Sequence, residues 1–184
     1  MNEELRIKEI LAGNTSAFET IVDKYQNMAM TIAYRICNNL QDAEDVVQES
    51  FVTAFRHLHT FKLNSKFSTW FYRIVYNTSI SHIRSSIWIN NNEVDLSEAS
   101  KIPETDNVID INKLEQKKIV DNVLNSIPKG DSLILTLYYL DDESVKDIAK
   151  IVGLTESNVK IKLFRARKTF KEKLQSMYGN YRLY

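Results

Sequence analysis

Apolar residues recur every three or four positions in the first part of the chain, which is the spacing of one face of an α-helix. Ser16 and Glu19 have the form of a capping box at a helix start, and the periodic pattern then runs to about Cys37. Two further periodic segments predict helices from about Ala43 to Leu58 and from about Ser68 to Ser86. Only four glycines and two prolines occur in 184 residues, which argues against strands joined by tight turns. Three such helices can close a small bundle.

An acidic stretch follows this bundle. From Asn90 to Asp110 there are six acidic residues and one basic residue, a composition typical of a linker. A second periodic segment begins near Val108, and the short apolar run "SLILTLYYL" after it is predicted to be buried. We therefore predict an all-α chain of two small helical domains, the first a bundle of three to four helices. The predicted ranges are 1–89 for the first domain, 90–107 for the linker and 108–184 for the second domain.

The segment from Ser144 to Leu174 has the pattern of a helix-turn-helix unit. Ser144 with Asp147 can cap a short helix from Val145 to Val152. Gly153 falls at the end of that helix, where a left-handed backbone conformation favours glycine. Thr155 can then cap the next helix. A plain antiparallel helix pair is the alternative interpretation.

Charge favours the DNA-binding interpretation of this unit. Between Lys160 and Lys173 there are seven Lys/Arg and one Glu, whereas a solvated helix face usually mixes both signs. Outward side chains on this helix would suit base edges and phosphates in a major groove. The predicted duplex-contacting residues are Ser157, Asn158, Lys160, Ile161, Lys162, Phe164, Arg165 and Arg167.

A second unusual stretch contains no acid. No Asp or Glu occurs between Glu49 and Glu93, yet this interval holds five Lys/Arg and nine of the nineteen aromatic residues. Aromatic rings that stack bases, beside cations that follow phosphates, are typical of single-strand binding. Asparagine side chains there could hydrogen-bond a base drawn from the stack. The alternative is that the aromatics form core, which we expect for Phe71 and for Tyr72 or Tyr76. The predicted single-strand site consists of Phe61, Lys62, Asn64, Lys66, Phe67, Trp70, Arg73 and Asn77.

The second predicted helix concentrates negative charge near its start, where the helix dipole favours it. Simple capping explains Asp42, but an acidic, partly apolar ridge of Asp45, Gln48 and Glu49 beside Val47 suggests a separate partner. One domain that captures single strands, joined to one that docks in a duplex groove, is an arrangement suited to reading promoters.

The blocks from Asp42 to Asn77 and from Ile127 to Phe170 closely resemble the two conserved blocks of bacterial extracytoplasmic-function (ECF) sigma factors. The resemblance extends from about Ala12 to Leu174, and it implies sigma domain two, a linker and sigma domain four. It also implies that the acidic helix binds the clamp helices of the largest subunit of RNA polymerase. The core polymerase-binding residues expected on this basis are Asp42, Glu44, Asp45, Gln48, Glu49 and Phe51.

The same resemblance implies roles for the two DNA-binding surfaces. The stretch matching Phe61 to Asn77 would recognise and melt the minus-ten element, and the helix matching Ser157 to Arg167 would read the minus-thirty-five element. The implied partners are core polymerase, including its flap for domain four, promoter DNA and an anti-sigma factor. Lys162 stands where the family often has Arg, and Ile161 where a small polar residue is common.

Two other classes of protein were weighed. A classical regulator with a sensory helical domain would explain the helix-turn-helix unit but not the acid-free aromatic stretch. A nuclease would need a metal site, yet His57 and His59 do not share a helix face, His82 looks isolated, and Cys37 fits packing. We expect no enzyme activity, no catalytic residue, no metal and no cofactor.

The acidic N-terminus has no apolar signal core, and no segment is long and apolar enough to span a membrane. We therefore expect a cytoplasmic protein without membrane insertion.

Overall fold

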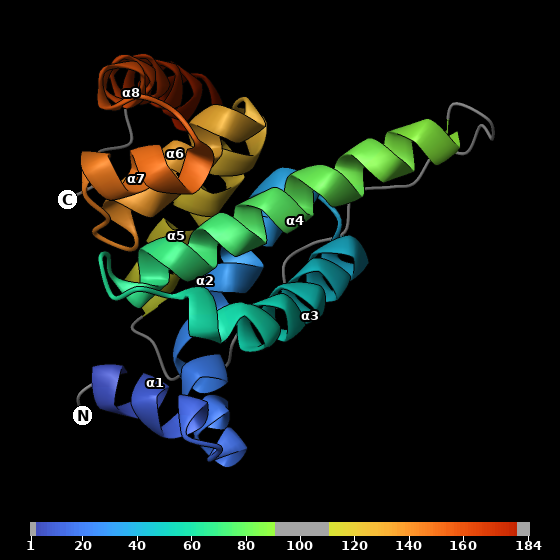
Figure 1. Ribbon diagram of the computed structural model, residues 1–184. Coiled ribbons are helices and arrows are strands. Elements are labelled where there is room, and N and C mark those ends of the chain that lie inside the picture. Colours follow the sequence, from blue (N-terminus) through green and yellow to red (C-terminus); the bar gives the residue numbers. More distant parts are fainter. Residues whose placement is uncertain (1–2, 91–110, 180–184) are drawn as a thin grey trace. The chain divides into compact units, whose positions relative to one another are not determined.

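The computed structural model describes residues 3–90 and 111–179, and their side chains except those of 86–90 and 111–114. Every regular element within these ranges is a helix (Figure 1), which confirms the predicted all-α class. The described residues form two compact units, one comprising residues 3–90 and 150–153 and the other residues 111–149 and 154–179. The predicted linker, residues 90–107, lies outside the described residues except for Asn90.

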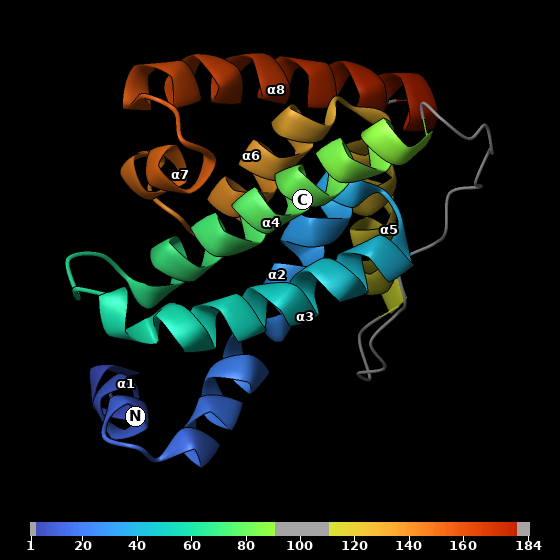
Figure 2. The same ribbon diagram turned by 45° about the vertical axis from the view of Figure 1, so that its right-hand side comes forward.

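The first unit is a bundle of helices joined by short connections. Its helices are α1 (Glu3–Leu11), α2 (Glu19–Cys37), α3 (Leu40–His57) and α4 (Phe67–Asn90), with short 3-10 turns at Thr15–Phe18 and Leu58–Thr60. Helices α2, α3 and α4 pack against one another along their lengths, as both ribbon views show (Figure 2). Residues that are completely buried in their shared core are Ala29, Ile32, Ala33, Ala43, Val46, Ala54, Phe71 and Val75.

The helix starts differ from those predicted. Ser16 lies in a 3-10 turn and its Oγ donates to Asn14 Oδ1 at 2.7 Å, so the predicted capping box of Ser16 and Glu19 is wrong. Helix α3 begins three residues earlier than expected because Asn39 is its N-cap: Asn39 Oδ1 accepts from the backbone N–H groups of Gln41 and Asp42.

Helix α1 was not predicted from the sequence. It buries Ile7 and Ile10 and contacts both 3-10 turns of the first unit. The carboxylate of Glu3 accepts hydrogen bonds from Lys24 Nζ and Tyr25 Oη, which ties the start of α1 to α2. Helix α1 is too short to be stable alone. It is held in place by the burial of Ile7 and Ile10 and by the two hydrogen bonds to the Glu3 carboxylate.

The second unit contains α5 (Ile111–Ser126), α6 (Lys129–Tyr139), the first part of α7 (Val145–Val152) and α8 (Glu156–Tyr178), while residues 150–153 are grouped with the first unit. Helix α8 packs against α5 and α6. Ile119 and Val123 of α5 join Leu174 of α8 in one apolar cluster, and Asn122 Nδ2 donates to Tyr178 Oη at 3.0 Å beside it. The apolar run of α6 is buried from Ser132 to Leu137, as predicted, but Tyr139 and Leu140 are exposed.

The helix-turn-helix segment follows the predicted boundaries. Ser144 Oγ accepts from the Asp147 N–H at the start of α7, and its hydroxyl donates to the Asp147 carboxylate. Gly153 has φ of +69°, and the Leu154 N–H reaches back to the Ala149 carbonyl, which is the six-residue bond of a Schellman turn. Thr155 then caps α8 by accepting from the Asn158 N–H. Local chemistry therefore determines where α8 begins.

Candidate nucleic-acid interface

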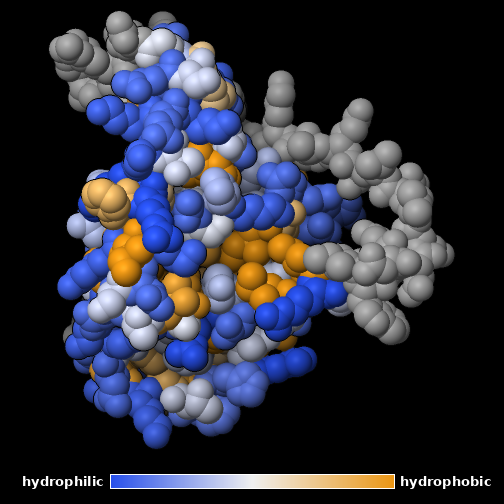
Figure 3. Space-filling model, turned by 90° about the horizontal axis from the view of Figure 1, so that it is seen from above, coloured by the Kyte–Doolittle hydropathy of each residue, from blue (hydrophilic) through white to orange (hydrophobic). Residues whose placement is uncertain are grey.

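Helix α8 presents a basic surface opposite its buried stripe. Val159, Leu163 and Ala166 are buried at helical spacing and hold the helix against its own unit. All the predicted duplex-contacting residues are exposed except Lys162, which is partly buried. No described side chain forms an ion pair with Lys160, Lys162 or Arg165, so their charge is not neutralised within the part of the chain that the structure describes. Seen from above, the molecular surface is mostly hydrophilic, with separate apolar patches among the polar groups (Figure 3).

Arg167 differs from the other basic residues of α8. Its guanidinium carbon lies 5.4 Å from the ring centroid of Tyr138 and 5.5 Å from that of Tyr139, both at the end of α6. These are cation–π distances, and each such contact at an exposed site contributes about 0.5–1 kcal/mol. Arg167 is therefore held toward α6, and its predicted role at a DNA groove has the least structural support of the set.

The aromatic stretch is packed more deeply than its sequence suggested. Phe61 retains 8% and Phe67 only 2% of its possible exposure. Phe67 lies 5.2 Å from Tyr25, 5.6 Å from Phe61 and 5.9 Å from Phe71, ring centre to ring centre. Neither Phe61 nor Phe67 offers an open face to a base in this conformation, so the stacking of bases on these two rings stays a prediction that their burial does not support. The two rings are buried because each packs one end of the connection against the core of the bundle.

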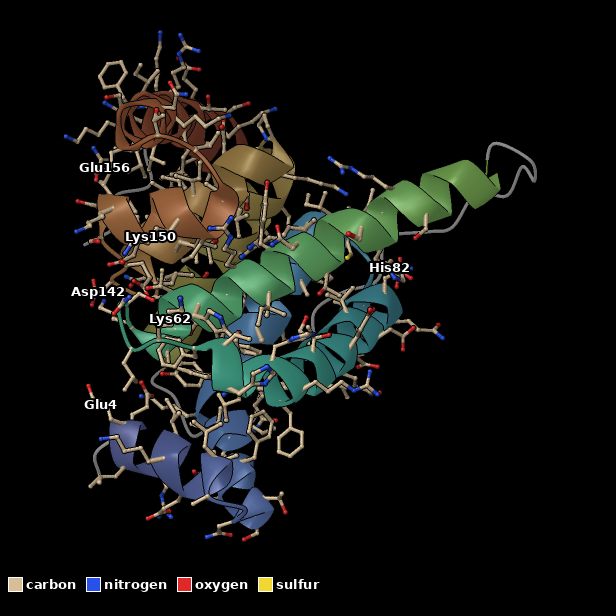
Figure 4. All side chains as sticks on the ribbon, in the orientation of Figure 1. Glu4, Lys62, His82, Asp142, Lys150 and Glu156 are labelled. Atoms are coloured by element: carbon tan, nitrogen blue, oxygen red, sulfur yellow. The ribbon has the colours of Figure 1, made fainter. Side chains whose placement is uncertain are left out.

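Trp70, like Tyr76, is an aromatic residue of this stretch with a partly exposed side chain. Its ring lies 5.3 Å from Phe61 and 5.4 Å from Phe67, which support it from below. Arg73 and Asn77 follow at helical spacing on the same side of α4 and are exposed. Lys62 lies in the connection before α4 (Figure 4) and is exposed, as are Asn64 and Lys66. The structure thus brings one tryptophan, two asparagines and three cations to a single region.

The acidic helix α3 has an exposed stripe that differs in part from the predicted ridge. Asp45, Gln48 and Glu49 are exposed as predicted, but Val47 and Phe51 are buried, retaining 7% and 9% exposure. Phe51 packs 4.6 Å from the Phe71 ring and 6.3 Å from the Phe18 ring, so it is part of the core in this structure, and its contact with polymerase stays a prediction. The apolar residue of the stripe is instead Val52, at 47% exposure. We call Asp45, Gln48, Glu49 and Val52 the α3 ridge.

His82 is not isolated, contrary to the prediction. Its Nε2 lies 3.2 Å from Asp42 Oδ1, and Figure 4 shows it on α4 beside the start of α3. Asp42 is therefore turned toward α4, whereas Glu44 is exposed. The spacing of 40 residues between His82 and Asp42 gave no signal in the sequence, because only the antiparallel packing of α3 and α4 brings them together.

The described ranges contain neither a cluster of metal ligands nor a membrane-spanning helix. No three His, Cys, Asp or Glu side chains among those residues come together as metal ligands. None of the helices described there has the length and apolar character needed to cross a membrane.

Two protein-family matches correspond to the two units. Residues 21–89 match the Sigma-70 region 2 family, and residues 117–170 match the Sigma-70 region 4 family. Together, the two matches indicate a protein of the sigma-70 family. Region 2 includes the α3 ridge and the surface around Trp70, and region 4 includes the helix-turn-helix segment.

Whole-chain relatives agree with these matches. The chain is 30% identical to the ECF RNA polymerase sigma factor SigW of Bacillus subtilis, over 94% of this chain and 96% of the relative. The chain belongs to the ECF sigma factors. It is 28% identical to the ECF RNA polymerase sigma-E factor of Haemophilus influenzae, over 96% and 97% of the two chains. Its fold is similar to that of the sigma factor RpoE in a complex with the anti-sigma factor NepR from Bartonella quintana, with a TM-score of 0.71, 20% identity and coverage of 86% and 96%.

Proposed function

We propose that this protein directs core RNA polymerase to specific promoters in the cytoplasm, and that it acts by recruitment rather than by catalysis. The observation that carries this proposal is the presence of sigma regions 2 and 4 in that order, each with an exposed surface of the matching chemistry. The polymerase catalyses RNA synthesis, whereas the sigma factor positions the polymerase on the promoter and holds the opened strand.

The α3 ridge is the proposed contact with the clamp helices of the polymerase's largest subunit. Asp45, Gln48, Glu49 and Val52 form an exposed acidic stripe with one apolar residue at its C-terminal end. Charged residues at the edge of an interface guide association, while a desolvated apolar contact slows dissociation. Asp42 would act through its contact with His82, and Glu44 would extend the acidic edge. Region 4 would make a second contact with the polymerase flap.

The region around Trp70 is the proposed minus-ten site. Trp70 can stack one base of the opened strand, a contact that is worth about 1–3 kcal/mol. Lys62, Lys66 and Arg73 would follow phosphates, and Asn64 and Asn77 would bond the edge of a base drawn out of the stack. Phe61 and Phe67 would support Trp70 from the core instead of stacking bases themselves.

Helix α8 is the proposed reader of the minus-thirty-five duplex. Thr155 and the turn at Gly153 set its start, and its exposed basic face would lie in the major groove. Lys160 and Lys162 would contact phosphates, while Ser157, Asn158 and Arg165 would reach base edges.

Control by an anti-sigma factor is the proposed regulation. The similar RpoE structure was solved in a complex with the anti-sigma factor NepR. An anti-sigma factor that covered the α3 ridge would block the polymerase contact directly, without unfolding either unit.

A binding experiment with sigma-free core polymerase tests the polymerase contact. We expect Asp45→Arg to weaken association with core by tenfold or more, because it reverses one of the two acidic charges of the ridge. Asp23→Arg is the matched control: Asp23 is equally exposed but lies on α2, and its variant should bind as the native protein does. Equal binding by all three proteins would refute the assignment of the α3 ridge.

A further inference from the structure

Two large apolar side chains project from the most basic helix of the protein. Phe164 keeps 72% of its possible exposure, the highest value among the exposed large apolar residues of the described chain, and Ile161 keeps 50%. Ile161 lies midway between the buried Val159 and Leu163 in sequence, which at 100° per residue places it opposite the buried stripe. Phe164 follows three positions later, so the two side chains are neighbours on the outer face.

The surroundings of this pair determine what could cover it. Lys160, Lys162 and Arg165 flank Ile161 and Phe164, and no acidic residue occurs between Glu156 and Glu172. An uncompensated cationic surface favours a polyanion and disfavours a basic or neutral partner. The occupant must therefore offer apolar groups set among negative charges. In the major groove of DNA this description fits the C5-methyl group of thymine.

We propose that Ile161 and Phe164 read thymine methyl groups in the minus-thirty-five element, so that this chain selects duplexes by apolar contact as well as by hydrogen bonds. The proposal rests on the proposed role of α8 in the major groove and specifies what that helix recognises. Removal of a buried methyl costs about 0.8 kcal/mol, which corresponds to about fourfold in affinity.

The spacing along α8 indicates the form of the element. Three residues rise about 4.5 Å along a helix axis, and successive bases on one strand are about 3.4 Å apart. Ile161 and Phe164 can therefore reach thymines on neighbouring base pairs. Arg165 lies beside Phe164 and is exposed, and a guanidinium pairs with the O6 and N7 of guanine. We expect adjacent thymines next to a guanine.

The test is to replace thymine by uracil, which removes the methyl group and leaves every hydrogen-bonding atom in place. Duplexes are first selected from a random pool with the full-length protein, and each thymine in the selected element is then changed to uracil singly. The native protein should lose about fourfold in affinity at one or two adjacent positions. Ile161→Ser should bind thymine and uracil duplexes equally at the position that Ile161 reads.

Met177→Ser is the matched control, because Met177 is an exposed apolar residue of the same helix at 45% exposure. It lies sixteen residues, or about 24 Å, beyond Ile161 along α8, and its variant should keep the full uracil effect. Sequence-specific binding that is indifferent to uracil at every position would overturn the methyl proposal while leaving the role of α8 intact. Absence of sequence-specific duplex binding would instead remove the proposed function of α8, and the methyl proposal with it.

Discussion

His82 Nε2 lies 3.2 Å from Asp42 Oδ1 and joins the middle of α4 to the first turn of α3. Both side chains are partly exposed, at 27% for His82 and 40% for Asp42. The contact links the helix that carries Trp70 to the helix that carries the α3 ridge. The proposed strand-capturing surface and the proposed polymerase-binding surface are thus held in one rigid bundle.

Replacing His82 by alanine should therefore change stability little. Partly exposed pairs of this kind contribute about 0–1 kcal/mol, and we expect a loss within that range in the free energy of unfolding. A double-mutant cycle with Asp42→Asn, measured by chemical unfolding, isolates the coupling between the two side chains. A coupling well above 1 kcal/mol would show that the pair stabilises the bundle more than its exposure allows.

Trp70→Ala should damage promoter opening and spare association with core polymerase. The loss of one stacked base corresponds to about 1–3 kcal/mol, or about fivefold to 150-fold in the population of open complex. Trp70→Phe should recover part of the loss, because a smaller ring still stacks. Permanganate reactivity of unpaired thymines measures opening, and a pull-down with core measures association. Loss of both activities to the same degree would mean that the two surfaces are not separate.

Phe67→Ala should act through stability instead. Phe67 is 2% exposed and contacts Tyr25, Phe61 and Phe71, and truncation of a buried phenylalanine costs about 3–5 kcal/mol. Thermal unfolding followed by circular dichroism should show a strongly lowered transition for the first unit. If the Phe67→Ala variant kept native stability but opened promoters poorly, Phe67 would have a direct role in DNA binding.

Gly153→Ala should destabilise the helix-turn-helix segment by about 1–2 kcal/mol, because Gly153 has φ of +69° and a left-handed conformation costs other residues about that much. A Cβ atom added there would meet nothing within 4 Å, so backbone strain is the sole expected cause. Gly153→Asn should cost less, since asparagine tolerates this conformation. Equal losses for alanine and asparagine, measured by urea unfolding, would contradict the strain explanation.

Lys160→Gln should weaken duplex binding about equally for all sequences. If Lys160 contacts one phosphate, the slope of log affinity against log salt should fall in magnitude by about 0.9. Asp131→Asn serves as the comparison, because it removes an acidic charge from α6 of the same unit and leaves the charges of α8 unchanged. An unchanged salt slope for Lys160→Gln would show that this lysine contacts no phosphate.

The parts of the fold that depend on neighbouring residues could be predicted from the sequence. The bounds of α7, the turn at Gly153 and the cap at Thr155 all follow from local chemistry, and each is confirmed. The contact of His82 with Asp42 and the burial of Phe51, Phe61 and Phe67 depend on how distant helices pack. An aromatic residue beside cations has the same local pattern whether its ring faces solvent or core, so only the packing of the bundle distinguishes Trp70 from Phe67.

Transcription in vitro tests the central claim most directly. Sigma-free core polymerase is supplied with pooled genomic fragments of the source bacterium, with and without this protein, and the new transcript ends are mapped. We predict discrete start sites that share two upstream elements at a fixed spacing, and none without the protein. DNA binding by the purified protein with no new transcript would contradict the account and favour a conventional regulator.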